Sequence, residues 1–175
     1  MNIKAMIDDY YEAAEGSEKI EAYHERHGIK SAGILTVIDD ETAAMITAYL
    51  RPRIAGKVVV EIGAGIGLLA CHLATEAAKV YAIEVDPNWT SCFLAALYER
   101  KPPNLTFIFG AAEQAPPFVA DVAVFCTHSG HAAMYAAGAR FAPVVIDVYR
   151  DVLGSAEYER RYQLAGRAEQ AKETR

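Results

Sequence analysis

The sequence predicts an α/β fold: a doubly wound, mostly parallel sheet of about five strands, preceded by a helical cap segment. From Lys57 onward, short apolar runs alternate with stretches of helical periodicity, which is typical of parallel strands joined by helical crossovers. The runs are rich in Val, Ile and Phe and nearly continuous in apolarity, as in strands buried on both faces. A glycine-rich turn, Gly63-Ala64-Gly65-Ile66-Gly67, directly follows the first run. Together these features predict a sheet with a ligand-binding corner.

The elements follow from this alternation. Strands are predicted at Val58–Ile62, Val80–Val85, Thr106–Phe109, Asp121–Phe125 and Val144–Val148. Helices are predicted between them at Gly67–Ala77, Trp89–Glu99 and about His131–Arg140. Between the third and fourth strands, Pro116-Pro117 leaves room for at most a short helix.

No linker, repeat or low-complexity tract divides the chain, so we expect a single domain. Its parts are a helical cap segment (1–55), a core sheet (57–150) and a C-terminal helical tail (151–175). The last cap helix is predicted to begin after Asp39 or Asp40 and to end near Leu50, before Pro52.

Composition and charge exclude several classes of protein. The chain has 175 residues, a net charge of -6 and a pI near 5.4; since nucleic-acid binding usually demands a basic face, no nucleic-acid partner is expected. No apolar run reaches about 18 residues, and the N-terminal segment is acidic, so neither a membrane span nor a signal peptide is expected. Cys71, Cys92 and Cys126 stand in apolar runs, which suits reduced thiols in a cytoplasmic protein.

The glycine turn predicts a bound adenosine-containing molecule. Glycines let ligand atoms approach the backbone N–H groups, and the following helix begins with a favourable field for an anionic group. Glu84 lies near the end of the second predicted strand, and a carboxylate about 20 residues beyond such glycines reaches ribose hydroxyls.

Two departures from a dinucleotide fingerprint favour S-adenosylmethionine over NAD. Position 68, where the fingerprint has a small residue, is Leu68. Glu61 stands two residues before the first glycine; it would repel a pyrophosphate, but it would attract the α-amino group of S-adenosylmethionine. A nicotinamide or flavin nucleotide, and a strand–helix corner without a ligand, remain as alternatives.

The segments Val59–Gly67 and Val80–Asp86 resemble the first and second motifs of the class I S-adenosylmethionine-dependent methyltransferases. The resemblance covers about Lys57–Tyr149 and implies the strand order 3-2-1-4-5, without the family's usual C-terminal strands. The fifth strand would then form an edge, which the tail helix or a second subunit of a homodimer would cover.

The resemblance also implies the cofactor contacts. Glu61 would lie near the amino group, Glu84 would hold the ribose diol and Val85 would cover one face of the adenine. The family's third motif places a Gly-Asp pair after the third strand, where this chain has Gly110-Ala111-Ala112-Glu113; the adenine edge would therefore meet Glu113 or the backbone near Ala112. The predicted cofactor-binding residues are Glu61, Gly63, Ala64, Gly65, Gly67, Glu84, Val85, Ala112, Glu113 and Cys126.

The fourth strand runs into Cys126-Thr127-His128. Ligands of such sheets sit beyond the carboxyl ends of the strands, where the winding reverses, so this segment should border the transferable methyl group. His128 is the predicted catalytic base, with capping of the following helix as the alternative role. No metal is expected, because His24 and His27 lack further ligands nearby in the sequence.

The sequence thus predicts S-adenosylmethionine-dependent methyl transfer to a small molecule or a protein side chain. The strand-end motifs of amino-methylating DNA enzymes and ribosomal adenine dimethylases are absent, as are the paired glutamates of protein-arginine methyltransferases. The first alternative is a non-catalytic protein that binds S-adenosylmethionine and regulates or supports a partner. A nucleotide-dependent oxidoreductase is the third possibility.

Overall fold

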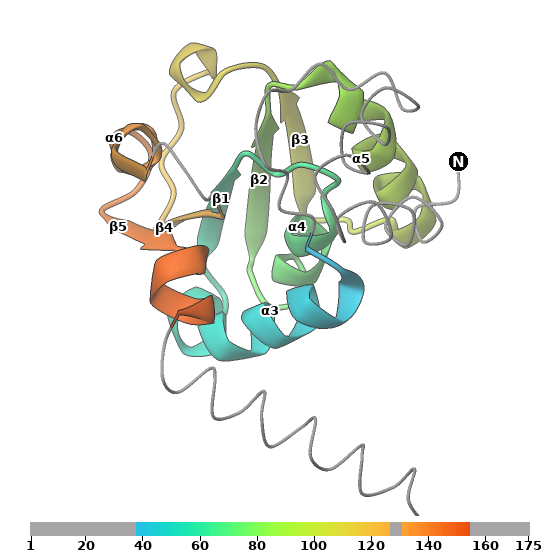
Figure 1. Ribbon diagram of the computed structural model, residues 1–175, viewed down its shortest axis with the longest axis horizontal. Helices are drawn as coiled ribbons and strands as arrows, with labels where there is room; N and C mark the ends of the chain where they lie inside the picture. The colour runs from blue at the N-terminus through green and yellow to red at the C-terminus, as the bar shows by residue number, and fades with distance from the viewer. Residues whose placement is uncertain (1–37, 127–130, 155–175) are drawn as a thin grey trace, which may run out of the picture.

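The computed structural model describes residues 38–126 and 131–154, which form a parallel sheet covered by helices on both faces (Figure 1). The predicted helices before residue 38, the tail after residue 154 and the candidate base His128 lie outside the described residues.

The five strands of the described sheet are β1 (Val58–Ile62), β2 (Lys79–Glu84), β3 (Leu105–Phe109), β4 (Val122–Phe125) and β5 (Val144–Asp147). Each begins and ends within one residue of its predicted range. Their order is β3-β2-β1-β4-β5 with every pair parallel, which confirms the predicted fold class and strand order. The winding reverses between β1 and β4, so a ligand site is expected at the carboxyl ends of these strands.

The helical elements are α3 (Asp40–Ile54), α4 (Leu68–Leu73), α5 (Pro87–Arg100), the 3₁₀ helix η1 (Ala112–Gln114), α6 (His131–Ala139) and the π-helix η2 (Val148–Leu153). One hydrophobic core lies between the sheet and α3, α4, α5 and η2, and a second lies on the opposite face beneath α6 and η1. Helix α4 ends at Leu73, four residues before the predicted end at Ala77, and a short turn leads into β2.

Helix α3 extends further than the sequence predicts. Asp39 caps it as expected, since its Oδ1 accepts the N–H of Thr42 at 2.7 Å. The helix does not end near Leu50, however, but continues through Pro52 to Ile54. Leu50 and Ile54 stand one turn apart and are both fully buried. Their burial holds the last turn in place although proline removes one backbone donor.

The carboxyl end of edge strand β5 is covered by the segment that directly follows it. Helix η2 folds back against α3, and Val148 and Val152 are fully buried in the first core. The N–H of Asp147 donates to Asp151 Oδ2 at 3.0 Å, which occupies one backbone donor at this end of the strand. The start of β5 is less covered, because Val144 is 46% exposed. The sequence analysis missed this helix, since it placed the covering helix further along the chain.

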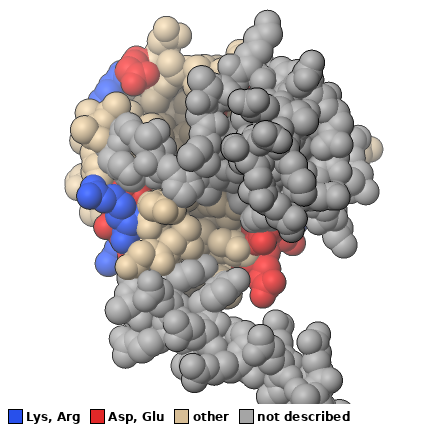
Figure 2. Space-filling view, in the orientation of Figure 1, with Lys and Arg blue, Asp and Glu red and all other residues tan. Residues whose placement is uncertain are grey.

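None of the helices within residues 38–126 and 131–154 is long and apolar enough to cross a membrane. On the face seen in Figure 2, the described acidic and basic side chains lie in small, separate groups.

Candidate functional site

The turn after β1 has a backbone conformation that favours glycine. Gly63, Gly65 and Gly67 have φ angles of +71°, +55° and +80°, in the left-handed region where side chains are strained. The N–H groups of Gly63 and Ala64 both donate to the carbonyl of Ile83, at 2.9 and 3.0 Å. The turn is thereby fixed to the end of β2.

The glycines differ in what surrounds them. A Cβ on Gly67 would lie 1.7 Å from Cδ2 of Phe93, so the turn packs directly against a core ring at the start of α4. A Cβ on Gly65 would meet no atom of the described residues within 4 Å. The turn is therefore closed toward the core at Gly67 and open at Gly65, where a ligand can approach the backbone.

Glu84, at the end of β2, is 5% exposed and has three backbone hydrogen bonds. Its Oε2 accepts the N–H of Gly65 at 2.7 Å, and its Oε1 accepts the N–H groups of Val85 and Asp86 at 2.8 and 2.7 Å. Bonds from N–H donors to a carboxylate are among the strong ones. Glu84 therefore fixes the middle of the glycine turn as well as offering an acceptor to a ligand.

Glu61, in β1, is 3% exposed, and its Oε2 accepts no hydrogen bond from the described residues. Burial raises the pKa of the Glu61 carboxyl well above its usual range, and the nearby charge of Glu84 raises this pKa further. A buried polar atom without a partner is rare in native proteins and costs free energy. Glu61 is thus an acceptor that a cationic ligand would satisfy.

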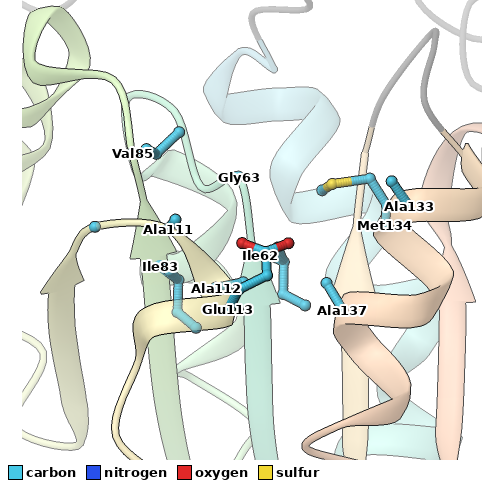
Figure 3. A pocket seen from close by; sticks show the side chains of 11 residues that line it. Ile62, Gly63, Ile83, Val85, Ala111, Ala112, Glu113, Ala133, Met134 and Ala137 are labelled. Atoms are coloured by element: carbon cyan, nitrogen blue, oxygen red, sulfur yellow. The ribbon is translucent and has the colours of Figure 1, made fainter.

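A pocket of about 210 Å³ opens beside the turn, on the α6 face of the sheet (Figure 3). Its lining is mostly apolar and consists of Ile62, Gly63, Ile83, Val85, Gly110, Ala111, Ala112, Glu113, Ala133, Met134 and Ala137. Four of the predicted cofactor-binding residues, Gly63, Val85, Ala112 and Glu113, lie in this lining. Its small and apolar side chains leave room for a flat ring system.

The wall formed by α6 was missed by the sequence analysis. Ala133, Met134 and Ala137 face η1 across the pocket (Figure 3). The available signal was the alanine-rich run Ala132-Ala133-Met134-Tyr135-Ala136-Ala137 in the helical segment that follows the fourth strand. Small residues on a helix beside the point where the winding reverses leave space for a ligand.

The opposite wall comes from the loop after β3. Gly110 has a φ of +141°, and η1 follows directly. The guanidinium of Arg140 donates from Nη1 to the carbonyl of Ala112 at 3.2 Å, which ties η1 to the end of α6. Glu113 is exposed, and its side chain reaches from η1 toward the pocket (Figure 3). Its carboxylate therefore lies close enough to contact a ring bound there.

The last of the predicted cofactor-binding residues, Cys126, is not part of the pocket lining. Cys126 follows β4 and is half-buried; burial, with the charges of Glu61 and Asp147, raises the pKa of its thiol to about 12. The thiol is therefore protonated at neutral pH. Trp89, near the start of α5, is buried in the first core and does not line the pocket. No cluster of His, Cys, Asp and Glu that suits a metal ion occurs within the described residues.

No family model matches the chain, and no curated protein matches it either. Solved structures of other proteins do match it. A putative RNA methyltransferase from Pyrococcus horikoshii superposes with a TM-score of 0.51 at 20% identity, over 60% of this chain and 57% of that one. A precorrin-6y C5,15-methyltransferase from Geobacter metallireducens gives 0.50 at 18% identity, over 64% and 62%. Magnesium protoporphyrin IX methyltransferase from Synechocystis with bound S-adenosylmethionine gives 0.52 at 18% identity, over 83% and 76%.

The chain has the class I S-adenosylmethionine-dependent methyltransferase fold. This confirms the predicted resemblance at the level of the fold. The chain spans less than two thirds of the length of the Pyrococcus and Geobacter proteins.

One expectation requires correction. The acidic net charge led us to expect no nucleic-acid partner, but this methyltransferase fold is shared with a putative RNA methyltransferase. That exclusion was wrong, because net charge describes the whole chain and does not report the surface around a binding site.

Proposed function

We propose that the chain binds S-adenosylmethionine at the turn after β1 and transfers its methyl group to a small molecule or a protein side chain. The observation that carries this proposal is Glu61, a buried carboxyl group whose Oε2 lacks a donor among the described residues. The α-ammonium group of S-adenosylmethionine would supply that donor. A pyrophosphate would instead bring negative charge beside the buried Glu84 and would offer Oε2 of Glu61 no donor, which argues against NAD and flavin nucleotides.

The remaining contacts of the cofactor follow from the geometry of the turn. A carboxylate has about four acceptor positions, and three of those on Glu84 are taken by backbone N–H groups. A ribose hydroxyl would take the remaining position or replace the N–H of Gly65. The adenine would occupy the apolar pocket between η1 and α6, with Val85 at one side and Glu113 at the edge.

S-adenosylmethionine supplies a methyl carbon bonded to a positively charged sulfur, which a lone pair of the acceptor can attack. For such a transfer the protein mainly has to align the acceptor with the methyl group. Cys126, at the end of β4, would border the methyl group as a protonated, neutral side chain. His128 is the proposed base, which would accept the proton that an N–H or O–H acceptor loses.

The test measures S-adenosylhomocysteine formation with the full chain, using metabolite, protein and RNA fractions as acceptors. We expect turnover with a metabolite or protein fraction, its loss in His128→Ala, and its retention in the control His72→Ala. His72 lies in an ion-paired cluster with Asp40 and Arg100, on the helices of the other face. Absence of binding of S-adenosylmethionine at about millimolar concentration would contradict the proposed cofactor. Binding without transfer to any fraction would contradict methyl transfer and favour a non-catalytic partner protein.

A further inference from the structure

We propose that Glu61 holds a proton while the site is free and releases it to solvent when a ligand with a cationic amino group binds. The site would thereby select ligands that carry an ammonium group, and it would bind them more tightly as the pH rises. This inference rests on the proposed function, because it concerns the same cofactor site.

The first support is the burial of Glu61 without a counter-charge. Glu61 lies within β1 with both neighbouring strands paired to it, and only 3% of its surface is exposed. Its Oε2 has no donor among the described residues. An ionised carboxylate in such a place would be strongly disfavoured, and a protonated carboxyl avoids most of that cost.

The second support is the chemistry of the groups that face Glu61. The charged group that acts on Glu61 is Glu84 on β2, and the negative charge of Glu84 disfavours a negative charge on Glu61. The thiols of Cys71 on α4 and Cys126 on β4 also interact with Glu61, and their own pKa values are raised to about 11 and about 12. These thiols are neutral at physiological pH, so they give Glu61 no positive partner.

The other charged groups near Glu61 do not supply it with a positive partner either. Arg100, which acts on Cys71, is bound to Asp40 with a distance of 2.6 Å between Nη2 and Oδ1. On the β4 side, Asp147 adds a further negative charge near Cys126. The phenol of Tyr135 on α6 interacts with Asp147, Arg150 and Asp151 rather than with Glu61. Within the described residues, protonation is therefore the available way to neutralise Glu61.

Binding of an ammonium group changes this balance. The ammonium donates to Oε2 and supplies a positive charge, which favours the ionised carboxylate. The carboxyl proton passes to the buffer and the ligand keeps all of its own protons, so the exchange is one proton released for one cation bound. No other bond is formed or broken.

The experiment is calorimetric titration of the full chain in two buffers of different ionisation enthalpy, which counts the protons released. The ligands are S-adenosylmethionine, which has both the ammonium and the sulfonium, S-adenosylhomocysteine, which has the ammonium but no sulfonium, and 5′-methylthioadenosine, which has neither. Over a pH series, we expect S-adenosylhomocysteine to release up to one proton wherever the free protein still holds it, and 5′-methylthioadenosine to release none at any pH. The affinity for S-adenosylhomocysteine should rise by up to about tenfold per pH unit while the free protein still holds the proton, and that for 5′-methylthioadenosine should stay constant.

Two variants provide the controls. Glu61→Gln should abolish proton release, and the matched variant Glu76→Gln should retain it, because Glu76 pairs with Arg51 away from the turn. Binding of S-adenosylhomocysteine without proton release, or equal release with 5′-methylthioadenosine, would overturn the inference while leaving the cofactor site intact. Release with S-adenosylmethionine alone would overturn the assignment to the ammonium. Failure of every ligand to bind would instead overturn the proposed function. If Glu61→Gln does not fold, the comparison of ligands on the natural chain still decides.

Discussion

The ends of β1 and β2 carry two buried glutamates that differ in their hydrogen bonds. Glu84 is 5% exposed and accepts three backbone N–H bonds, two of them from the next two residues in the sequence and one from Gly65. Glu61 is 3% exposed, and its Oε2 lacks a donor within the described residues. One carboxylate therefore already stabilises the turn, whereas the other has an acceptor atom that a ligand can occupy.

This contrast separates two roles that are hard to distinguish from spacing alone. Removing an acceptor that serves several donors should harm the fold as well as the site. Removing an unpartnered buried acid should harm the binding of a cationic ligand while sparing the fold.

Replacing Glu84 should affect both folding and binding. In Glu84→Gln, an amide NH₂ faces one or more of the three N–H donors, so at least one buried donor loses its acceptor. We expect a loss of about 3 kcal/mol in the free energy of unfolding, and a loss of about 100-fold in S-adenosylhomocysteine affinity. Urea denaturation and calorimetry measure the two quantities, with Glu76→Gln as the control. An unfolding free energy equal to that of the natural chain would show that these bonds do not stabilise the turn.

Replacing Glu61 should affect binding alone. In Glu61→Gln, the cationic amino group loses its charged acceptor, so the affinity for S-adenosylhomocysteine should fall by about 30-fold. The affinity for 5′-methylthioadenosine should be unchanged, and the thermal midpoint at neutral pH should not fall. An equal loss of affinity for both ligands would show that Glu61 does not bind the amino group of S-adenosylhomocysteine.

The pH dependence of stability should also distinguish Glu61. The pKa of its carboxyl is raised in the folded protein, so above about pH 4.3 the unfolded chain loses this proton while the folded chain keeps it. The natural chain should therefore lose stability relative to Glu61→Gln as the pH rises, by up to about 1.4 kcal/mol per pH unit, until the folded protein also ionises. Denaturation of both proteins over a pH series measures the difference in their free energies of unfolding. A difference that does not vary with pH would show that Glu61 does not hold a proton in the folded protein.

A smaller effect on stability is expected at the open part of the turn. In Gly65→Ala, the new methyl group meets no atom within 4 Å in the part of the chain that the structure describes, but the φ of +55° strains the backbone. The free energy of unfolding should fall by only about 1 kcal/mol, whereas cofactor binding should weaken strongly because the methyl group occupies the approach to the backbone. Binding equal to that of the natural chain would show that the ligand does not pass over Gly65.

Much of this site could be predicted from the sequence, because its signals are local. The apolar runs located every strand to within one residue, and the glycine spacing located the turn and Glu84. The features that the sequence did not predict depend on contacts between distant segments. The last turn of α3 persists through Pro52 because Ile54 is buried, and no local rule reveals that.

The same limit applies to the pocket and to Glu84. Spacing placed Glu84 near a ribose, but its bond to Gly65 appears only once the turn folds back over β2. Met134 and Ala137 line the pocket because the crossover brings α6 opposite η1. The bond from Arg140 to the carbonyl of Ala112 joins residues 28 positions apart. Periodicity within one helix indicates which face is apolar, but it does not identify the opposing element.

The most direct measurement is a crystal structure of the full chain with S-adenosylhomocysteine. We expect the amino nitrogen within about 3 Å of Glu61 Oε2, or joined to it by one water, the ribose hydroxyls at Glu84 and the adenine in the pocket between η1 and α6. A ligand whose amino group points away from Glu61, or one bound away from the turn, would show that Glu61 does not bind the amino group.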